Sequence, residues 1–232
     1  MKHTFALLSL LSIVACSSSE PEVPAVVDPY PTTDAFCAAL AKAECVGAAG
    51  NCGVKVDACE TYRRQIVCLE GVAKAATASG KRAYASGNAP TCIAQSTELW
   101  KKGAITNAEW EIVKDACGRV FGGMVEINKP CDTKFDCKDQ TLVCDKGFCA
   151  KRIDKKIGEG CADPGAICER TASCTGTPMM CAGRVLKGAG EECASSDECS
   201  DATPVCDPYK VPVVCRQSLI VGTEACRQFG GN

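Results

Sequence analysis

The sequence predicts a small disulfide-rich protein, in which an N-terminal α-helical domain stapled by disulfides precedes a tandem array of short cysteine-rich units made of strands and turns. Cysteine accounts for 21 of the 232 residues, whereas aromatic residues make up only 5%. This composition is typical of disulfide scaffolds that fold in an oxidising compartment. The cysteines recur at a fixed period after residue 128, and helical patterns of apolar residues precede them.

Residues 1–15 have the organisation of an export signal. A charged start at Lys2 precedes an apolar run, Phe5–Val14, and the small residue Ala15 stands directly before Cys16. The apolar run holds about ten residues, and a spanning helix needs about twenty. The segment Leu11–Cys16 resembles a bacterial lipobox, in which an aliphatic residue stands three before the cysteine and small residues lie between. We therefore expect residues 1–15 to be removed as a signal peptide.

The lipobox resemblance implies a lipid anchor at Cys16. In such precursors the thiol receives diacylglycerol, and the amino group exposed by cleavage is then acylated, for example with palmitate. Two or three acyl chains hold a protein stably on a bilayer. The alternative is an ordinary secretory signal, and on either interpretation the chain leaves the cytoplasm. We expect a cell-envelope location in the outer membrane, because Ser17 supplies no acidic retention signal.

Residues 16–33 form the predicted lipidated N-terminus and tether. Four prolines and no cysteine follow Cys16 in this segment, which favours an extended, semi-rigid spacer. Loss of Lys2 with the signal leaves 25 of the 26 basic residues against 28 acidic ones. The net charge of the mature chain is therefore close to zero, whereas nucleic-acid-binding proteins usually carry a basic surface. We expect no nucleic-acid partner.

Assigning Cys16 to lipid leaves an even number of cysteines for disulfides. Within residues 125–232 a short motif with a leading cysteine returns about every 30 residues, at Cys131, Cys161, Cys193 and Cys226. The spacers are rich in Gly, Pro, Asp and Ser, which indicates turns and short strands. The twenty cysteines expected in structural disulfides are Cys37, Cys45, Cys52, Cys59, Cys68, Cys92, Cys117, Cys131, Cys137, Cys144, Cys149, Cys161, Cys168, Cys174, Cys181, Cys193, Cys199, Cys206, Cys215 and Cys226.

Two frames divide the array. In the first, each leading cysteine closes the preceding unit, so that the units run 137–161, 168–193 and 199–226 and eight cysteines remain in the N-terminal region. In the second, units begin at Cys131, Cys161 and Cys193, and Cys226 reaches back to the N-terminal seven. We favour the first frame because it needs only local bridges, and each four-cysteine unit allows three connectivities.

Residues 34–124 show helical patterns. The sequence predicts helices from a cap at Asp34 through Cys45, over 57–75, and over 88–100 with a proline in the first turn. A capping box at 106–109 begins another, which Gly122 and Gly123 end. On the second helix Cys59 and Cys68 lie nine residues apart and face opposite ways, so they should bond to different neighbours.

Several of these motifs together resemble a group of cysteine-rich lipoproteins of myxobacteria. They are Phe36-Cys37, the segments 41–45 and 91–93, Ala116–Phe121 with Gly123, and the repeats after Cys131. Repeats of this kind are described as similar to the Dickkopf N-terminal cysteine-rich region. The resemblance covers most of the mature chain and implies a surface or periplasmic lipoprotein of unassigned function. It carries no catalytic residue and no signalling role, because a shared cysteine framework is a scaffold.

The sequence offers no catalytic, metal or cofactor site. His3 is the only histidine and lies in the signal, and no two cysteines have Cys-x-x-Cys spacing. Serine or cysteine nucleophiles paired with histidine, zinc ligation and thioredoxin-like chemistry are therefore not expected. Acidic residues gather at 132–145 and at 197–201, where we expect solvated turns rather than calcium ligands. Trp100 and Trp110 are expected in the core, and the basic pairs at 63–64 and 101–102 on solvated helix faces.

The leading functional expectation is a non-enzymatic binding or structural module. It would be a stapled rod on the cell surface, held by membrane lipid through Cys16 and contacting a protein or a polysaccharide through loops between cysteines. An alternative is a protease inhibitor that presents residues 207–212 as a rigid loop. A hydrolase that relies on carboxylates alone is the third hypothesis.

Overall fold

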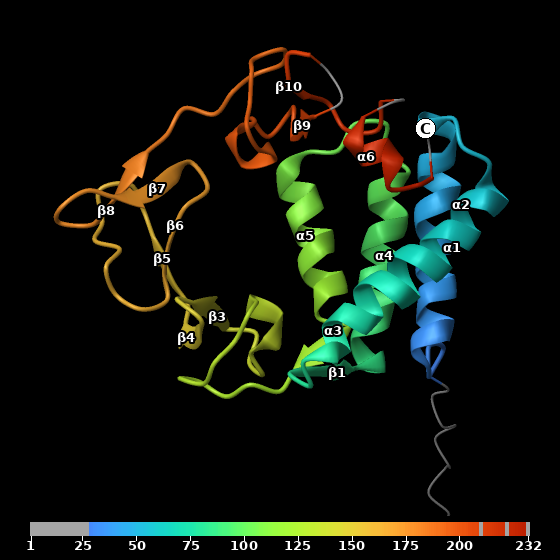
Figure 1. Cartoon of the computed structure of the whole chain (residues 1–232), viewed down its shortest axis with the longest axis horizontal. Coiled ribbons are helices and arrows are strands. Elements are labelled where there is room, and N and C mark those ends of the chain that lie inside the picture. Colours follow the sequence, from blue (N-terminus) through green and yellow to red (C-terminus); the bar gives the residue numbers. More distant parts are fainter. Residues whose placement is uncertain (1–27, 209–210, 221–222, 231–232) are drawn as a thin grey trace, which may run out of the picture.

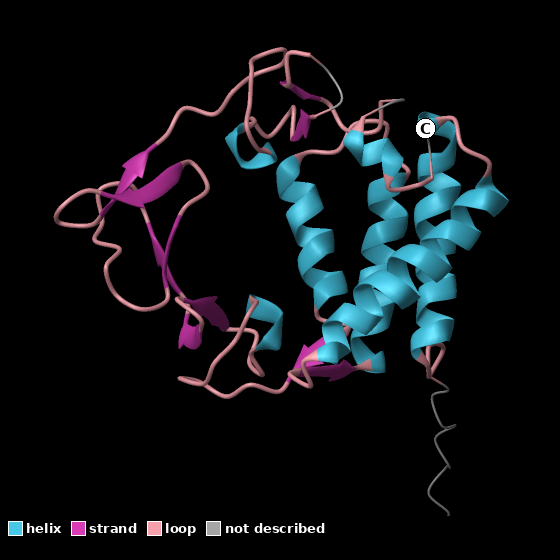
Figure 2. Cartoon of the chain, viewed as in Figure 1, coloured by secondary structure: helices cyan, strands magenta, loops and turns pink. Residues whose placement is uncertain are grey.

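The computed structural model describes residues 28–208, 211–220 and 223–230 (Figure 1). The predicted signal, Cys16 and most of the tether lie outside these residues. A helical domain comes first along the chain, and an array of small strand pairs follows it (Figure 2). Within the described residues no helix is long and apolar enough to cross a membrane.

The first helix, α1 (Thr33–Cys52), is longer than predicted and has a different cap. Thr32 is the N-cap, because its hydroxyl accepts a hydrogen bond from the amide of Ala35 at 3.1 Å. Asp34 lies inside the first turn and pairs with Arg64 at 2.8 Å. The prediction of Asp34 as the cap is therefore wrong. The helix ends at Gly53, whose φ of 68° is the left-handed conformation that glycine adopts without a steric penalty.

The second predicted helix exists as three joined segments, α2 (Val56–Tyr62), the π-helical η1 (Arg63–Ala73) and α3 (Lys74–Ala78). Cys59 and Cys68 both bond to α1, through Cys45 and Cys37 respectively. The prediction that the two cysteines face opposite ways and bond to different neighbours is wrong, since both partners lie on one helix. A π-helical turn contains more residues than an α-helical turn, so nine residues no longer separate opposite faces. The pair of bridges thus fixes one helix along the other.

The next two helices follow the sequence closely. Helix α4 (Ala89–Trp100) has a proline in its first turn, and α5 (Asn107–Gly118) begins with the predicted capping box. In that box the Thr106 hydroxyl accepts from the Glu109 amide, and the Glu109 carboxylate accepts from the Thr106 amide at 2.9 Å. Helix α5 ends before Gly122, because residues 121–123 form β2 (Phe121–Gly123), which pairs antiparallel with β1 (Arg82–Tyr84).

Two apolar clusters fill the helical domain. One contains Phe36 and Phe121, with Tyr84 packed against them. The other contains Trp100, which makes edge contacts with Trp110 and Phe229 at centroid distances of 5.2 and 4.8 Å. The expectation that both tryptophans belong to the core is confirmed, since Trp100 is fully buried and Trp110 packs against the cluster.

The array contains three similar units, each with two disulfides and one antiparallel strand pair. In every unit the third and fourth cysteines face each other across the pair. A parallel pair, β5 with β6, joins the first unit to the second. The elements of the array are η3 (Lys134–Asp136), β3 (Leu142–Asp145), β4 (Phe148–Lys151), β5 (Ile153–Lys155), β6 (Ala166–Cys168), β7 (Ala172–Thr175), β8 (Met180–Gly183), η4 (Ser196–Glu198), β9 (Val205–Asp207) and β10 (Val214–Arg216). The last helix, α6 (Glu224–Arg227), lies near the C-terminus. The short helix η2 (Ser86–Asn88) directly precedes α4 in the helical domain.

The favoured cysteine frame is wrong, and the second frame is the one in the structure. Units begin at Cys131, Cys161 and Cys193, and within each the first cysteine bonds to the third and the second to the fourth. The remaining bridges lie in the helical domain, apart from Cys52–Cys226, which joins that domain to the C-terminal segment. The ten disulfides are Cys37–Cys68, Cys45–Cys59, Cys52–Cys226, Cys92–Cys117, Cys131–Cys144, Cys137–Cys149, Cys161–Cys174, Cys168–Cys181, Cys193–Cys206 and Cys199–Cys215.

The array does not extend away from the helices as a rod. It leaves the helical domain after β2, arches outward and returns to the opposite end of α5 (Figure 1). Its last residues leave the array, because Leu219, Cys226 and Phe229 are buried in the second apolar cluster of the helical domain. Both ends of the array are therefore attached to the helical domain, and the chain forms a closed frame.

Candidate functional site

Hydrogen bonds fix the returning end of the array on the helical domain. The Ser218 hydroxyl accepts from the Ile105 amide at 2.8 Å and donates to the Ile105 carbonyl at 3.1 Å. Asp201 provides a second cap for α5, because its carboxylate accepts from the Ala108 amide at 2.9 Å. Arg170 of the second unit pairs with Asp201 at 3.3 Å and donates to the carbonyl of Cys199 at 2.9 Å. Three parts of the chain thus meet at the start of α5.

At the other end of the array, glycines and ion pairs hold the first unit close to the helical domain. A β-carbon at Gly118 would overlap the ring of Phe135, and one at Gly123 would overlap the backbone of Asp136. Asp136 is buried and pairs with Arg82 at 3.1 Å. The first unit is therefore packed against the end of α5.

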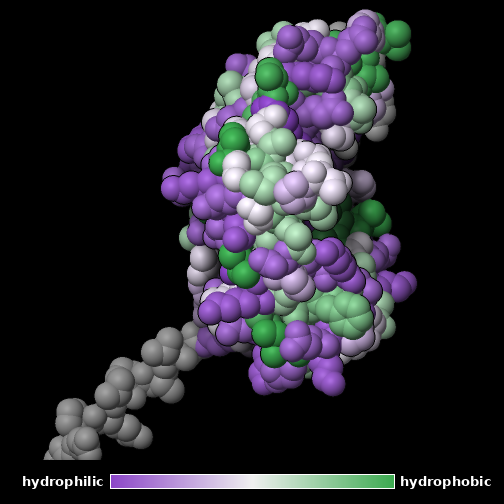
Figure 3. Space-filling model, turned by 90° about the vertical axis from the view of Figure 1, so that its left-hand side faces the viewer, coloured by the Kyte–Doolittle hydropathy of each residue, from purple (hydrophilic) through white to green (hydrophobic). Residues whose placement is uncertain are grey.

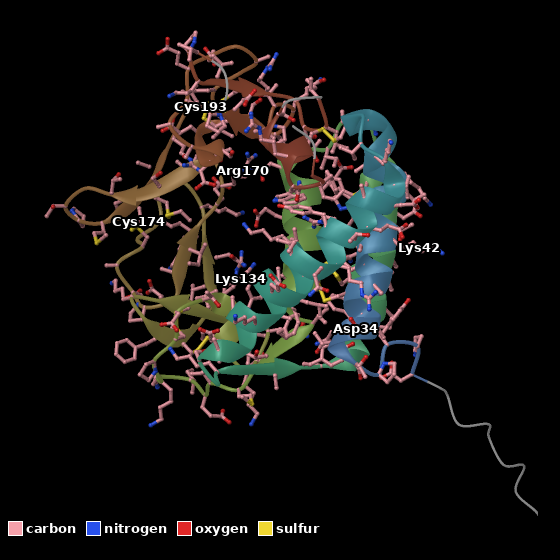
Figure 4. All side chains as sticks on the ribbon, turned by 45° about the vertical axis from the view of Figure 1, so that its right-hand side comes forward. Asp34, Lys42, Lys134, Arg170, Cys174 and Cys193 are labelled. Carbon is pink, nitrogen blue, oxygen red and sulfur yellow. A yellow bond between two sulfur atoms is a disulfide. The ribbon has the colours of Figure 1, made fainter. Side chains whose placement is uncertain are left out.

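A polar cleft of about 690 Å³ lies between helices α4 and α5 and the first unit. We call it the inner cleft. Figure 4 shows Lys134 and Arg170 between the array and the helices. The lining residues are mostly amides, charged groups and a hydroxyl, together with the half-exposed Ile112: Asn88, Thr91, Gln95, Glu111, Ile112, Asp115, Ala116, Arg119, Lys134, Gln140 and Arg152.

Asp115 is the electrostatic centre of the inner cleft. Its carboxylate accepts from Arg119 at 2.7 Å and pairs with Lys134 at 2.8 Å. Partial burial raises the pKa of Asp115, but the hydrogen bonds from Arg119 and Lys134 outweigh burial and leave the pKa lowered. The carboxylate is therefore ionised at neutral pH, and the three groups together hold one excess positive charge in fixed positions.

The cleft also contains a buried acceptor. The side-chain oxygen of Gln95 is buried without a hydrogen-bond partner among the described residues. A buried amide oxygen left unpaired costs about 1–3 kcal/mol, so a donor that reaches it gains that amount. The nearby Asn88 amide, in contrast, donates to the Arg119 carbonyl at 2.8 Å.

The predicted acidic clusters do not converge on one point. Asp136 accepts from the amides of Asp132 and Thr133, at 2.8 and 3.0 Å. Asp139 accepts from Thr141, and Asp145 from Gly165 of the next unit. In the second cluster Glu198 accepts from Ala194 and pairs with Lys187, while Asp201 caps α5. The expectation of solvated turns is wrong for Asp136, which is buried and structural.

The basic pair at 63–64 does not lie on a solvated face. Arg63 is buried and forms a bidentate pair with the buried Glu44, at 2.7 and 2.8 Å. It also donates to the Gln228 carbonyl at 3.1 Å and lies 5.3 Å from the centroid of the Phe229 ring. Sequence reasoning missed this group because its partners come from α1 and from the C-terminal segment. Lys101 and Lys102 lie on exposed faces, as expected.

The segment proposed for protease inhibition is described only in part, since residues 209–210 lie outside the described residues. Asp207 is buried and pairs with Arg216 at 3.3 Å, so it faces inward. Val211 is 98% exposed. The prediction of an exposed segment is therefore wrong at Asp207.

The chain is thus a small disulfide-rich protein with an N-terminal helical region and short strand pairs. Comparison with family models, with curated proteins and with solved structures found no match.

Proposed function

We propose that this protein is a lipid-anchored, extracytoplasmic binding module without catalytic activity, and that the inner cleft binds a segment of a polysaccharide. The observation that carries the ligand class is the lining of the cleft. Amides, a hydroxyl and paired charges surround a volume of about 690 Å³, and the Gln95 side chain is part of this lining. Hydroxyl groups of a sugar are donors and acceptors at once, so they suit such a lining.

The covalent frame supports a binding role. The first unit is tied by two disulfides beside the cleft, and bridge Cys92–Cys117 joins the two helices that form the opposite wall. Both walls are therefore fixed before a ligand arrives. Preorganised walls lower the entropy cost of binding, which suits a binding module.

The cleft is tested by titrating purified cell-envelope polysaccharides into the protein by calorimetry. We expect saturable binding, and we expect both Gln95→Leu and Lys134→Met to weaken it about tenfold, the effect of one polar contact. Lys138→Met is the matched control, since Lys138 pairs with Glu126 on an exposed surface outside the cleft lining. Binding that Lys138→Met weakens as much as Lys134→Met would contradict the cleft.

The anchor is tested by the intact mass of the mature protein taken from its own membrane and alkylated without reduction. We expect a chain that begins at Cys16, carries acyl chains and has no alkylated thiol. An unmodified Cys16 would contradict the lipid anchor. Free thiols would contradict the ten disulfides.

A further inference from the structure

The structure has an exposed apolar patch at the end of the molecule where the described chain begins. Met124, Ile127 and Phe148 are each about half exposed, at 51%, 48% and 52%. We call these three residues, with Lys129 and Lys146, the basal patch. Hydrogen bonds hold the segment 127–129 beside β4, from the Asn128 amide to the Cys149 carbonyl at 2.7 Å and from the Cys149 amide to the Lys129 carbonyl at 3.0 Å.

The basal patch lies near the start of the described chain. The hydroxyl of Tyr84 donates to the carbonyl of Tyr30 at 2.6 Å, so the first residues before α1 are fixed against β1. On the same two-stranded sheet, the amide of Met124 donates to the carbonyl of Lys81 at 2.9 Å. The small sheet of β1 and β2 therefore lies between Tyr30 and Met124, the first apolar residue of the patch. Figure 3 shows hydrophobic side chains among hydrophilic ones at this lower end of the array.

The two lysines of the patch carry charge that no acid of the described chain neutralises. Neither Lys129 nor Lys146 has a carboxylate within ion-pair distance, and both are exposed. The neighbouring acids are already engaged, since Glu126 pairs with Lys138 and Asp132 pairs with Lys81. Unpaired lysines beside exposed aromatic and aliphatic side chains are the composition that binds anionic bilayer surfaces.

We propose that the basal patch rests on the anionic surface of the membrane, with Phe148 and Ile127 inserted among the headgroups and the two lysines over lipid phosphates. This inference rests on the proposed lipid anchor. Eleven residues separate Cys16 from Asp28, and this stretch can span at most about 40 Å, so an anchored chain can bring the patch to the bilayer. A second weak contact then orients the molecule and holds the array upright over the surface.

The second unit provides a matched control. The amide of Gly158 donates to the carbonyl of Cys181 at 2.8 Å, as Asn128 does to Cys149, and Gly160 bridges to Met180 as Pro130 does to Phe148. Ile157 and Met180 are exposed at these equivalent positions. Met180 lies in β8 and Ile157 follows β5, and Figure 1 shows both strands farther along the arch from β1 than β3 and β4 are. A membrane contact set by the anchor should not use them.

The experiment uses the mature chain secreted with Cys16→Ser, so that no acyl chain contributes. Co-sedimentation is measured with vesicles of phosphatidylethanolamine and phosphatidylglycerol, and with phosphatidylcholine alone. We expect binding to the anionic vesicles that weakens with salt. Ile127→Ser with Phe148→Ser should weaken it at least tenfold. Lys129→Gln with Lys146→Gln should weaken it about tenfold or more and remove most of the salt dependence.

Ile157→Ser with Met180→Ser should leave binding unchanged. A loss equal to that of the basal pair, or no binding to anionic vesicles by a correctly folded chain, would overturn the proposal. The intact mass of the native protein tests the anchor separately. An acylated Cys16 without vesicle binding would therefore reject the basal patch as a membrane contact and support the lipid anchor. Vesicle binding with an unmodified Cys16 would support the basal patch and reject the lipid anchor.

Discussion

Cys52 at the end of α1 is bonded to Cys226 in α6, with their Cα atoms 5.3 Å apart although 174 residues separate them in the sequence. Both cysteines are buried. The bridge closes the frame, since the helical domain, the array and the C-terminal segment lie between its two ends. Among the residues that the structure describes, it is the one disulfide that joins the helical domain to the C-terminal segment.

Replacing both cysteines, Cys52→Ala with Cys226→Ala, should lower the free energy of unfolding by about 2–4 kcal/mol, the usual contribution of a native bridge. The double change avoids a free thiol. Thermal unfolding followed by circular dichroism measures the loss, and limited proteolysis should cut first near residues 217–230. Cleavage that starts within the first unit instead would contradict this function of the bridge.

The buried pair of Arg63 and Glu44 should be sensitive to the loss of one partner. Glu44→Gln or Arg63→Met leaves a buried charge unpaired, which costs about 3–5 kcal/mol. The double variant Glu44→Gln with Arg63→Met should recover part of that loss, because no uncompensated charge remains. Chemical denaturation of the four proteins gives the coupling energy.

Arg64→Met serves as the control for that cycle, because Arg64 and Asp34 form an exposed pair in the same pair of helices. Exposed pairs contribute about 0–1 kcal/mol. A loss for Arg64→Met as large as that for Arg63→Met would show that burial is not the cause.

Gly123 should tolerate no side chain, because a β-carbon there overlaps the backbone of Asp136 and Cys137. Gly123→Ala is expected to destabilise the protein by about 1–3 kcal/mol, the cost of overpacking. Gly50→Ala is the control. Gly50 lies within α1 with nothing within 4 Å of a new β-carbon, so alanine there should stabilise the helix by up to about 1 kcal/mol. Equal effects of the two changes would argue against a tight junction.

The capping box of α5 should make stability depend on acid. The hydrogen bond from Lys102, followed by those from the backbone and hydroxyl of Thr106, lowers the pKa of Glu109 from 4.5 to about 2. A folded-state pKa below the unfolded one gives stability that is complete above about pH 4.5 and is lost as pH falls toward 2. The pKa values of Asp115 and Asp136 are also lowered, so their contributions have the same sign.

Urea denaturation across this pH range provides the measurement. Glu109→Gln should flatten the decline, and Lys102→Met should make it smaller and end it at a higher pH, because the folded-state pKa of Glu109 then lies closer to 4.5. A decline of the same slope in Glu109→Gln would exclude the capping box as a source of the acid sensitivity.

Much of the helical domain could be predicted because its signals are local. The Thr106–Glu109 box and the proline at the start of α4 act within four residues, and both appear as expected. The errors arose where another part of the chain decides. The π-helical turn of η1 places Cys59 and Cys68 against α1, and Asp34, predicted as the cap of α1, pairs instead with Arg64 of η1.

The inner cleft had no signal in the sequence. Its walls come from α4, α5 and the first unit, and Lys134 reaches Asp115 from the first unit, which packs against the end of α5 where Phe135 lies close to Gly118. The cysteine spacing likewise allowed two frames of even count. The frame with local bridges was favoured by loop length alone, and loop-closure entropy rises too slowly with length to exclude a long bridge.

The sequence by itself determined the class of scaffold, the period of the array and the positions of most helices, since composition, spacing and capping are properties of short segments. The tertiary structure alone decided which cysteines bond, why Arg63 is buried beside Glu44, and where the array ends. The C-terminal residues return to the helices because Leu219 and Phe229 are apolar side chains that find a core only there. Burial and pairing depend on which segments meet in space, and that arrangement is settled when the whole chain packs.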